Sequence, residues 1–194
     1  QSISKFVDVD KEYSKKVKNL YKLPEKYIFY PAMYLPHKNH KYVIDVIKIL
    51  NSEYNLDLSA VFCGSDKGYL KKIKKYADDK KKNKNIIFLD FVEGKDLPYL
   101  YLNSLALVMP TLSGPTNIPP WEAFKMKVPV FYSDIHNIRN VYLDAVYYVD
   151  PLDPKTMASG IKDLINNPEL KNNLIENGMK LFNSVDVKKE LEQF

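Results

Sequence analysis

The sequence predicts an α/β fold, a Rossmann-like, doubly wound parallel sheet of about six strands. From residue 27 onward, short apolar runs alternate with longer amphipathic stretches, and the runs are rich in β-branched and aromatic residues. The 194 residues, 45% of them hydrophobic, suit one compact core. In such a fold the ligand binds at the carboxyl ends of the strands, where the strand order reverses.

Each expected strand is short and bounded by turn-forming residues, and each expected helix has apolar residues at helical spacing. The strands are expected at 27–32, 59–64, 85–90, 105–110, 129–134 and 146–150. The helices are expected at 41–52, 67–82, 96–103, 120–127, 154–166 and 168–182. Residues 1–24 form an approach segment whose helix ends before Pro24. Residues 25–183 form the α/β domain, and residues 184–194 form a carboxyl-terminal tail.

The positive charge is concentrated in one segment. Residues 71–84 contain eight lysines and two aspartates, whereas the whole chain has a net charge of +5. This pattern favours an amphipathic helix with a solvated lysine face, and peripheral contact with an anionic membrane is the alternative. Tyr76 is the one aromatic residue of this segment, which is not the aromatic interleaving that base stacking requires, so no nucleic-acid partner is expected.

Several classes of protein are excluded by missing features. The sequence has no run of about 18 apolar residues, no basic and apolar leader, and a single cysteine, Cys63, which we expect to be buried. These features favour a cytoplasmic location, with the inner face of the membrane as the alternative. The phosphate-binding motifs GxGxxG and GxxxxGK[ST] are also absent, which disfavours P-loop chemistry and common dinucleotide binding.

The loop before the expected helix 120–127 is a candidate anion site. Pro119 and Pro120 suit the start of a helix, and the amides of Thr116, Asn117 and Ile118 are free to face a ligand. The amino terminus of a helix attracts phosphate, so this loop predicts a phosphate site.

Glu122 and Lys38 flank this loop in the expected fold. We place Glu122 in the first turn of the helix, where its carboxylate can accept two hydrogen bonds from a ribose diol. The alternative is that Glu122 merely complements the helix dipole. Lys38 follows the first strand, and in a doubly wound sheet its loop converges with 113–118 on one diphosphate, although a loop lysine is most often solvated surface.

The motifs resemble a known family. The segments P-H-K-N-H after the first strand, C-G-S at the end of the second, and S-G-P-T-N-I-P-P-W-E-A resemble the carboxyl-terminal, donor-binding domain of family 4 retaining glycosyltransferases. The resemblance covers about residues 25–183 and implies one half of a GT-B fold. The variant G-P-T-N-I-P-P is similar to bacterial polysaccharide transferases, among which mannosyl transfer is frequent.

The resemblance implies roles for individual residues. Glu122 would bind the donor ribose, and the amides of Thr116, Asn117 and Ile118 would hold the diphosphate or sugar. Lys38 would contact the phosphates and stabilise the leaving group, which makes it the expected catalytic residue.

Further positions border the donor in this resemblance. Phe91 and Val92 would lie beside the nucleobase, and His37 near the sugar or phosphate. Gly114 is counted among the donor-binding positions because it replaces an upstream glutamate of the family. The arginine usual five residues before the phosphate-binding lysine is Met33 here, so one diphosphate cation is missing.

No metal and no other cofactor is expected. His37 and His40 are three residues apart, but no third ligand accompanies them at a recognisable spacing. In the sugar transfer that the resemblance implies, a lysine and backbone amides would stabilise the negative charge of the diphosphate without a divalent cation.

The implied reaction is retaining transfer of a sugar from a GDP- or UDP-linked donor to an acceptor hydroxyl in polysaccharide or glycan synthesis. The family has a second, amino-terminal domain for the acceptor, so this chain alone is expected to have little or no activity. One alternative is a non-catalytic nucleotide-binding module of the same fold. Another is an epimerase of related fold, for which the sequence offers no identifiable catalytic carboxylates.

Overall fold

A computed structural model describes residues 10–79, 83–90, 92–114 and 118–184. Six parallel strands form one sheet in the order β3-β2-β1-β4-β5-β6. The strands are β1 (Tyr27–Pro31), β2 (Ser59–Cys63), β3 (Ile86–Leu89), β4 (Ala106–Met109), β5 (Val130–Ser133) and β6 (Tyr147–Val149). The doubly wound parallel fold is therefore confirmed, and each strand lies within one of the expected ranges.

The helices also follow the expected order, with one addition. They are α1 (Lys11–Leu20), α2 (His40–Ser52), α3 (Leu70–Asp79), α4 (Leu97–Leu102), α5 (Ile118–Lys125), α6 (Ile138–Tyr142), α7 (Pro154–Asn166) and α8 (Pro168–Ser184). Two 3₁₀ turns, η2 (Pro36–Lys38) and η3 (Asn83–Asn85), precede α2 and β3. Helix α6 was not expected, because five residues give too short a periodic pattern. In the part of the chain that the structure describes, no helix has the length and apolar character to cross a bilayer.

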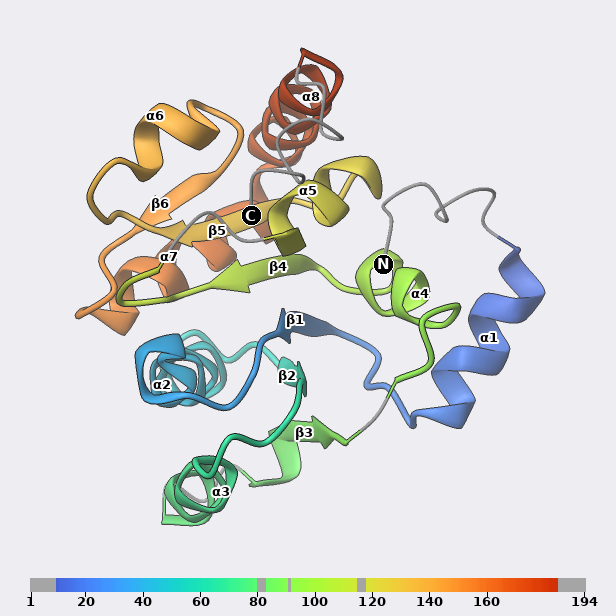
Figure 1. The fold of residues 1–194 in the computed structure, drawn as a ribbon, viewed down its shortest axis with the longest axis vertical. Helices are drawn as coiled ribbons and strands as arrows, with labels where there is room; N and C mark the ends of the chain where they lie inside the picture. The colour runs from blue at the N-terminus through green and yellow to red at the C-terminus, as the bar shows by residue number, and fades with distance from the viewer. Residues whose placement is uncertain (1–9, 80–82, 91, 115–117, 185–194) are drawn as a thin grey trace.

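The helices cover both faces of the sheet (Figure 1). Helix α2 lies beside α3 and α7 on one face, whereas α4 and α5 lie on the other, with α1 packed against α4 and α8 against α5. This division follows from the strand order, because right-handed connections change face when the chain reverses direction across the sheet. The reversal lies between β1 and β4.

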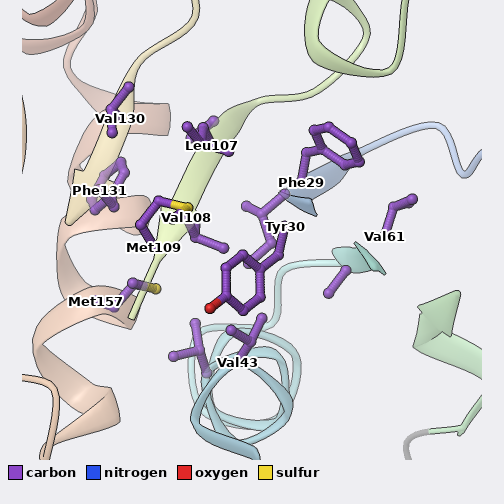
Figure 2. Close-up of a cluster of buried hydrophobic side chains, with 14 of the residues drawn as sticks. Phe29, Tyr30, Val43, Val61, Leu107, Val108, Met109, Val130, Phe131 and Met157 are labelled. Carbon is purple, nitrogen blue, oxygen red and sulfur yellow. The ribbon is translucent and has the colours of Figure 1, made fainter. Parts of the chain in front are cut away.

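The core lies between the sheet and these helices. The central strands β1, β2, β4 and β5 are almost entirely buried, as expected of a parallel sheet covered on both faces. Figure 2 shows Val43 of α2 and Met157 of α7 among side chains of the central strands. Burial of these apolar side chains provides most of the stabilisation, at about 25 cal/mol per Å².

Gly64 allows β1 and β2 to approach closely where both end. A Cβ atom at this position would lie 2.2 Å from the carbonyl oxygen of Ala32. Directly beyond, the amide of Tyr34 donates a 3.1 Å hydrogen bond to the carbonyl of Ser65. The segments after β1 and β2 are therefore in contact, and only a glycine fits at residue 64 without a shift of the backbone.

The approach segment is tied to the domain through a buried carboxylate. Asp96, which is 1% exposed, accepts hydrogen bonds from Tyr13 (2.7 Å) and Tyr21 (2.8 Å). Val17 and Leu23 of the same segment belong to the buried core. Residues 10–24 are thus packed against the sheet domain rather than extended away from it.

Candidate functional site

The loops that follow β1 and β4 meet at the point where the strand order reverses. The carbonyl oxygen of His37 accepts a 2.8 Å hydrogen bond from the amide of Leu112 and a 3.3 Å hydrogen bond from the hydroxyl of Thr111. Thr111 is fully buried and its hydroxyl also lies 2.7 Å from the carbonyl oxygen of Ser113. The loop that carries Lys38 and the loop that leads to α5 are therefore joined directly.

Lys38 ends the 3₁₀ turn η2 and is 9% exposed, so it is not a solvated surface lysine. Burial lowers the pKa of its ammonium below the ordinary lysine value. The hydroxyl of Tyr30 donates a hydrogen bond to the Lys38 carbonyl from inside the core. A cation held on a braced turn at the carboxyl ends of the strands is suited to an anionic ligand.

The turn is also braced by the segment after β6. Asn39 adopts a left-handed conformation with φ of 57°, which asparagine tolerates, and begins α2. Its side chain donates a 3.0 Å hydrogen bond to the carbonyl of Pro151. The hydroxyl of Tyr42 lies 2.9 Å from the carbonyl of Asp150. The backbone around Lys38 is thus fixed from two sides.

Glu122 lies on α5, directly after β4, but not where the sequence placed it. Because α5 begins at Ile118 rather than at residue 120, Glu122 falls in the second turn, and the expectation of a first-turn position is wrong. The helix starts earlier because prolines at its second and third positions need no partner for their missing amide protons. Complementing the helix dipole from the first turn is therefore not the role of this carboxylate.

The carboxylate of Glu122 is held by a residue that the sequence did not single out. The hydroxyl of Tyr101, on α4, donates a 2.6 Å hydrogen bond to Oε2 of Glu122. Burial raises the pKa of the Glu122 carboxyl above its ordinary value, and the hydrogen bond from Tyr101 partly opposes this shift. No pattern in the sequence singles out Tyr101, since the spacing of residues on a helix does not show where a phenol points.

The remaining predicted donor residues are placed in part. Ile118 is 47% exposed at the start of α5, and Gly114 has φ of +124°, a conformation that strains any other residue. Val92 is half-buried against the core. Thr116, Asn117 and Phe91 lie outside the described residues.

The two histidines before α2 differ in environment. His37 is half-buried, whereas His40 is 1% exposed with its ring tilted against those of Tyr30 and Tyr34. Burial lowers the pKa of His40 to about 4. Among the described residues, no three His, Cys, Asp or Glu side chains form a group that could hold a metal ion.

Two other residues take structural positions. Trp121 is buried on α5 with its ring 5.8 Å from that of Phe124, so it packs in the core. Cys63 ends β2 and is half-buried, which is more exposed than expected. Burial nevertheless raises the pKa of the Cys63 thiol to about 11, which keeps the thiol protonated at neutral pH.

A protein-family model matches most of this chain. Residues 11–181 match the model described as "Glycosyl transferases group 1". The chain belongs to this family. The resemblance inferred from the loop motifs is therefore confirmed, and the matched region contains β1, α5 and both loops of the candidate site.

Curated relatives of this family member include two proteins of bacterial polysaccharide synthesis. The O-antigen chain mannosyltransferase RfbU of Salmonella typhimurium is 31% identical over 145 residues, which cover 75% of this chain and 40% of that protein. The capsular polysaccharide biosynthesis glycosyltransferase CapH of Staphylococcus aureus is 30% identical over 151 residues, which cover 75% of this chain and 41% of that protein. The chain thus spans about two fifths of these relatives.

Solved structures share its fold at low sequence identity. The carboxyl-terminal domain of a group 1 glycosyl transferase (LpcC) from Francisella tularensis superposes with a TM-score of 0.76 and 19% identity, covering 95% of this chain and 97% of that one. Anabaena Alr3699/HepE, solved in complex with UDP, superposes with a TM-score of 0.80 at 13% identity. The match covers 100% of this chain and 56% of that one. This chain therefore has the fold of one half of a GT-B architecture.

Proposed function

We propose that this chain is the donor-binding half of a retaining glycosyltransferase, which transfers a sugar from a nucleoside diphosphate to an acceptor hydroxyl in bacterial surface polysaccharide synthesis. The observation that carries the proposal is the direct contact of the two loops at the sheet reversal, with buried Lys38 on one and the entry to α5 on the other. The polysaccharide-related relatives support the proposed pathway class.

Lys38 acts on the leaving group in this proposal. The bond from the anomeric carbon to the β-phosphate oxygen breaks, its electron pair stays on the diphosphate, and the acceptor oxygen bonds to the same face of the sugar. The acceptor proton passes to a phosphate oxygen. The Lys38 ammonium and the backbone amides at the start of α5, among them that of Ile118, stabilise the growing negative charge, and no metal ion is invoked.

Glu122 holds the ribose. A carboxylate accepts but cannot donate hydrogen bonds, so it suits the two adjacent hydroxyls of a ribose and gives no preference for uridine or guanosine. In the proposed pose Val92, with Phe91 beside it in sequence, borders the base. His37 and Gly114, on the two joined loops, border the sugar.

Calorimetric titration of the chain with UDP, GDP and ADP tests donor binding and base preference together. Lys38→Ala is expected to lower the affinity for the preferred nucleotide by about tenfold or more, because a charge-assisted contact with phosphate is lost. Lys41→Ala is the matched control, since it removes the same charge from a side chain that lies over the Tyr76 ring instead. No binding of any nucleotide would refute the proposal, and equal effects of the two variants would remove Lys38 from it.

We further infer that the chain has little or no transferase activity by itself, because the proposed acceptor site belongs to a separate domain of a longer protein. The coverage of about two fifths of each relative supports this division. Efficient sugar transfer by this chain alone would contradict it. If the chain is instead a non-catalytic nucleotide-binding module, it should bind nucleotide but show no sugar transfer even when joined to the rest of the longer protein.

A peripheral membrane contact at the cytoplasmic face is a second component of the proposal. Lys71, Lys72, Lys74 and Lys75 are all exposed on α3, opposite the buried Ile73. Lysines near an anionic surface contribute about 1 kcal/mol each. We expect sedimentation with vesicles containing phosphatidylserine but not with pure phosphatidylcholine, and loss of binding when the four lysines become glutamine. Equal binding by the glutamine variant would rule out this face.

A further inference from the structure

We propose that Tyr101 is a positioning residue for donor recognition, which orients the Glu122 carboxylate and so sets the preference for ribose over deoxyribose. This inference rests on the proposed function, because it assigns Glu122 to the ribose. Tyr101 acts through Glu122 and is not proposed to touch the nucleotide.

The first support is the geometry of the contact. The 2.6 Å separation between the Tyr101 hydroxyl and Oε2 of Glu122 is short, as expected when a phenol donates to a charged oxygen. Among the described residues, Tyr101 is the one that donates a hydrogen bond to the Glu122 carboxylate. Oε2 is thereby fixed, and the rotation that would exchange the two oxygens is restrained. In the proposed pose, Oε1 then accepts from the adjacent hydroxyls of the ribose.

The second support is the rigidity of Tyr101. Its side chain is fully buried, and its ring lies edge-on to Phe29 of β1, with centroids 4.9 Å apart at an interplanar angle of 86°. Burial first, and the nearby Glu122 charge second, hold the pKa of the phenol well above its ordinary value. Tyr101 is therefore a permanent donor on a fixed ring.

The third support is the position of α4 in the fold. This helix connects the segment after β3, where the base is proposed to lie, to β4. Tyr101 therefore joins the base side of the site to the ribose side through one hydrogen bond across 21 residues of sequence. Without the bond, the half-buried carboxylate of Glu122 would lose this partner, and both its charge and its orientation would become less favourable.

The chain offers a matched control on β1, in contact with the same helix. Tyr27 is also fully buried, and its hydroxyl donates a 2.7 Å hydrogen bond to the carbonyl of Leu100 in α4. Tyr27→Phe therefore deletes a buried phenol that braces α4 without touching Glu122. Tyr101→Phe deletes the phenol that holds the carboxylate. A purely structural role of Tyr101 would make the two variants equivalent.

The experiment measures the affinity of the chain for UDP and 2′-deoxy-UDP, and for the corresponding guanosine pair, in the wild type and both variants. We expect the wild type to prefer the ribonucleotide by about tenfold or more, since buried polar groups lose their partner with the deoxy ligand. Tyr101→Phe is expected to lower this preference to about twofold, whereas Tyr27→Phe retains it. Unfolding midpoints of both variants show whether either has lost its fold.

A double-variant measurement separates this inference from the function it rests on. If Tyr101 acts through Glu122, adding Tyr101→Phe to Glu122→Gln causes no further loss of ribonucleotide affinity. Retained ribose preference in Tyr101→Phe, or additive losses in the double variant, would overturn the inference and leave the donor site intact. Failure of the wild-type chain to bind either ribonucleotide would overturn both.

Discussion

The carbonyl oxygen of His37 and the amide nitrogen of Leu112 are joined by a 2.8 Å hydrogen bond. The two residues are far apart in sequence, but they follow the two strands between which the order of the sheet reverses. This backbone contact, together with the hydrogen bond from the Thr111 hydroxyl to the same carbonyl, holds together the two loops that carry the proposed donor site. Ligand affinity should depend on this contact even though neither side chain is required for it.

Replacing Leu112 tests the contact with two variants at one position. Leu112→Pro removes the amide proton, so the loops lose about 1 kcal/mol of hydrogen bonding and we expect nucleotide affinity to fall about fivefold. Leu112→Ala keeps the amide and is expected to bind within about twofold of the wild type. Calorimetric titration with the preferred nucleotide distinguishes them, and equal losses would show that the Leu112 side chain matters instead.

His40 predicts a pH-dependent stability. Its pKa of about 4 in the folded chain lies below the ordinary value of 6.5, because burial disfavours the charged ring. The neutral ring therefore makes its full contribution to the free energy of unfolding above pH 6.5. This contribution is lost as the pH falls toward 4. At about 1.4 kcal/mol per pKa unit, the loss amounts to about 3 kcal/mol.

Urea unfolding at pH 7 and pH 4 measures this loss. We expect His40→Phe to reduce the pH-dependent change in unfolding free energy by about that amount, since the ring packing is kept and the titrating group is gone. His136→Phe is the control because His136 is exposed. Parallel pH profiles for the wild type and His40→Phe would contradict the assignment.

Gly64→Ala is expected to destabilise the sheet where β1 and β2 end. The new methyl group would lie 2.2 Å from a carbonyl oxygen and 2.6 Å from the carbonyl carbon of Ala32, which are backbone atoms that cannot rotate away. Such overpacking is worth about 1–3 kcal/mol in the free energy of unfolding. Ser65→Ala, at the adjacent exposed position, should change stability by less than about 0.5 kcal/mol. Thermal or chemical unfolding that ranks the two equally would be inconsistent with the close approach.

Asp96→Asn tests the attachment of α1 to the domain. The buried carboxylate serves two phenols, from Tyr13 and Tyr21, and an amide offers one oxygen in its place. We expect a loss of about 1–3 kcal/mol in the free energy of unfolding. Glu93→Gln removes an exposed partner of Lys95 and should cost less than about 1 kcal/mol. An Asp96→Asn chain as stable as Glu93→Gln would show that the buried contact is not needed.

The candidate site was predictable to the extent that its residues follow strands. Lys38 and Glu122 were identified because apolar runs locate the strands and the residues that follow parallel strands gather at one edge. The start of α5 was less predictable, since adjacent prolines permit a helix to begin before, at or after them. That two-residue difference moved Glu122 from the first turn to the second.

The sequence by itself determined the alternation of strands and helices, the family of the chain and the edge of the sheet that carries the site. Those features depend on patterns that repeat over a few residues. Only the tertiary structure decided that Tyr101 donates to Glu122, that Asp96 accepts from Tyr13, and that Lys38 is buried. The first two contacts join residues 21 and 83 positions apart, so strand order and helix packing set them, and no local periodicity encodes which side chains then meet.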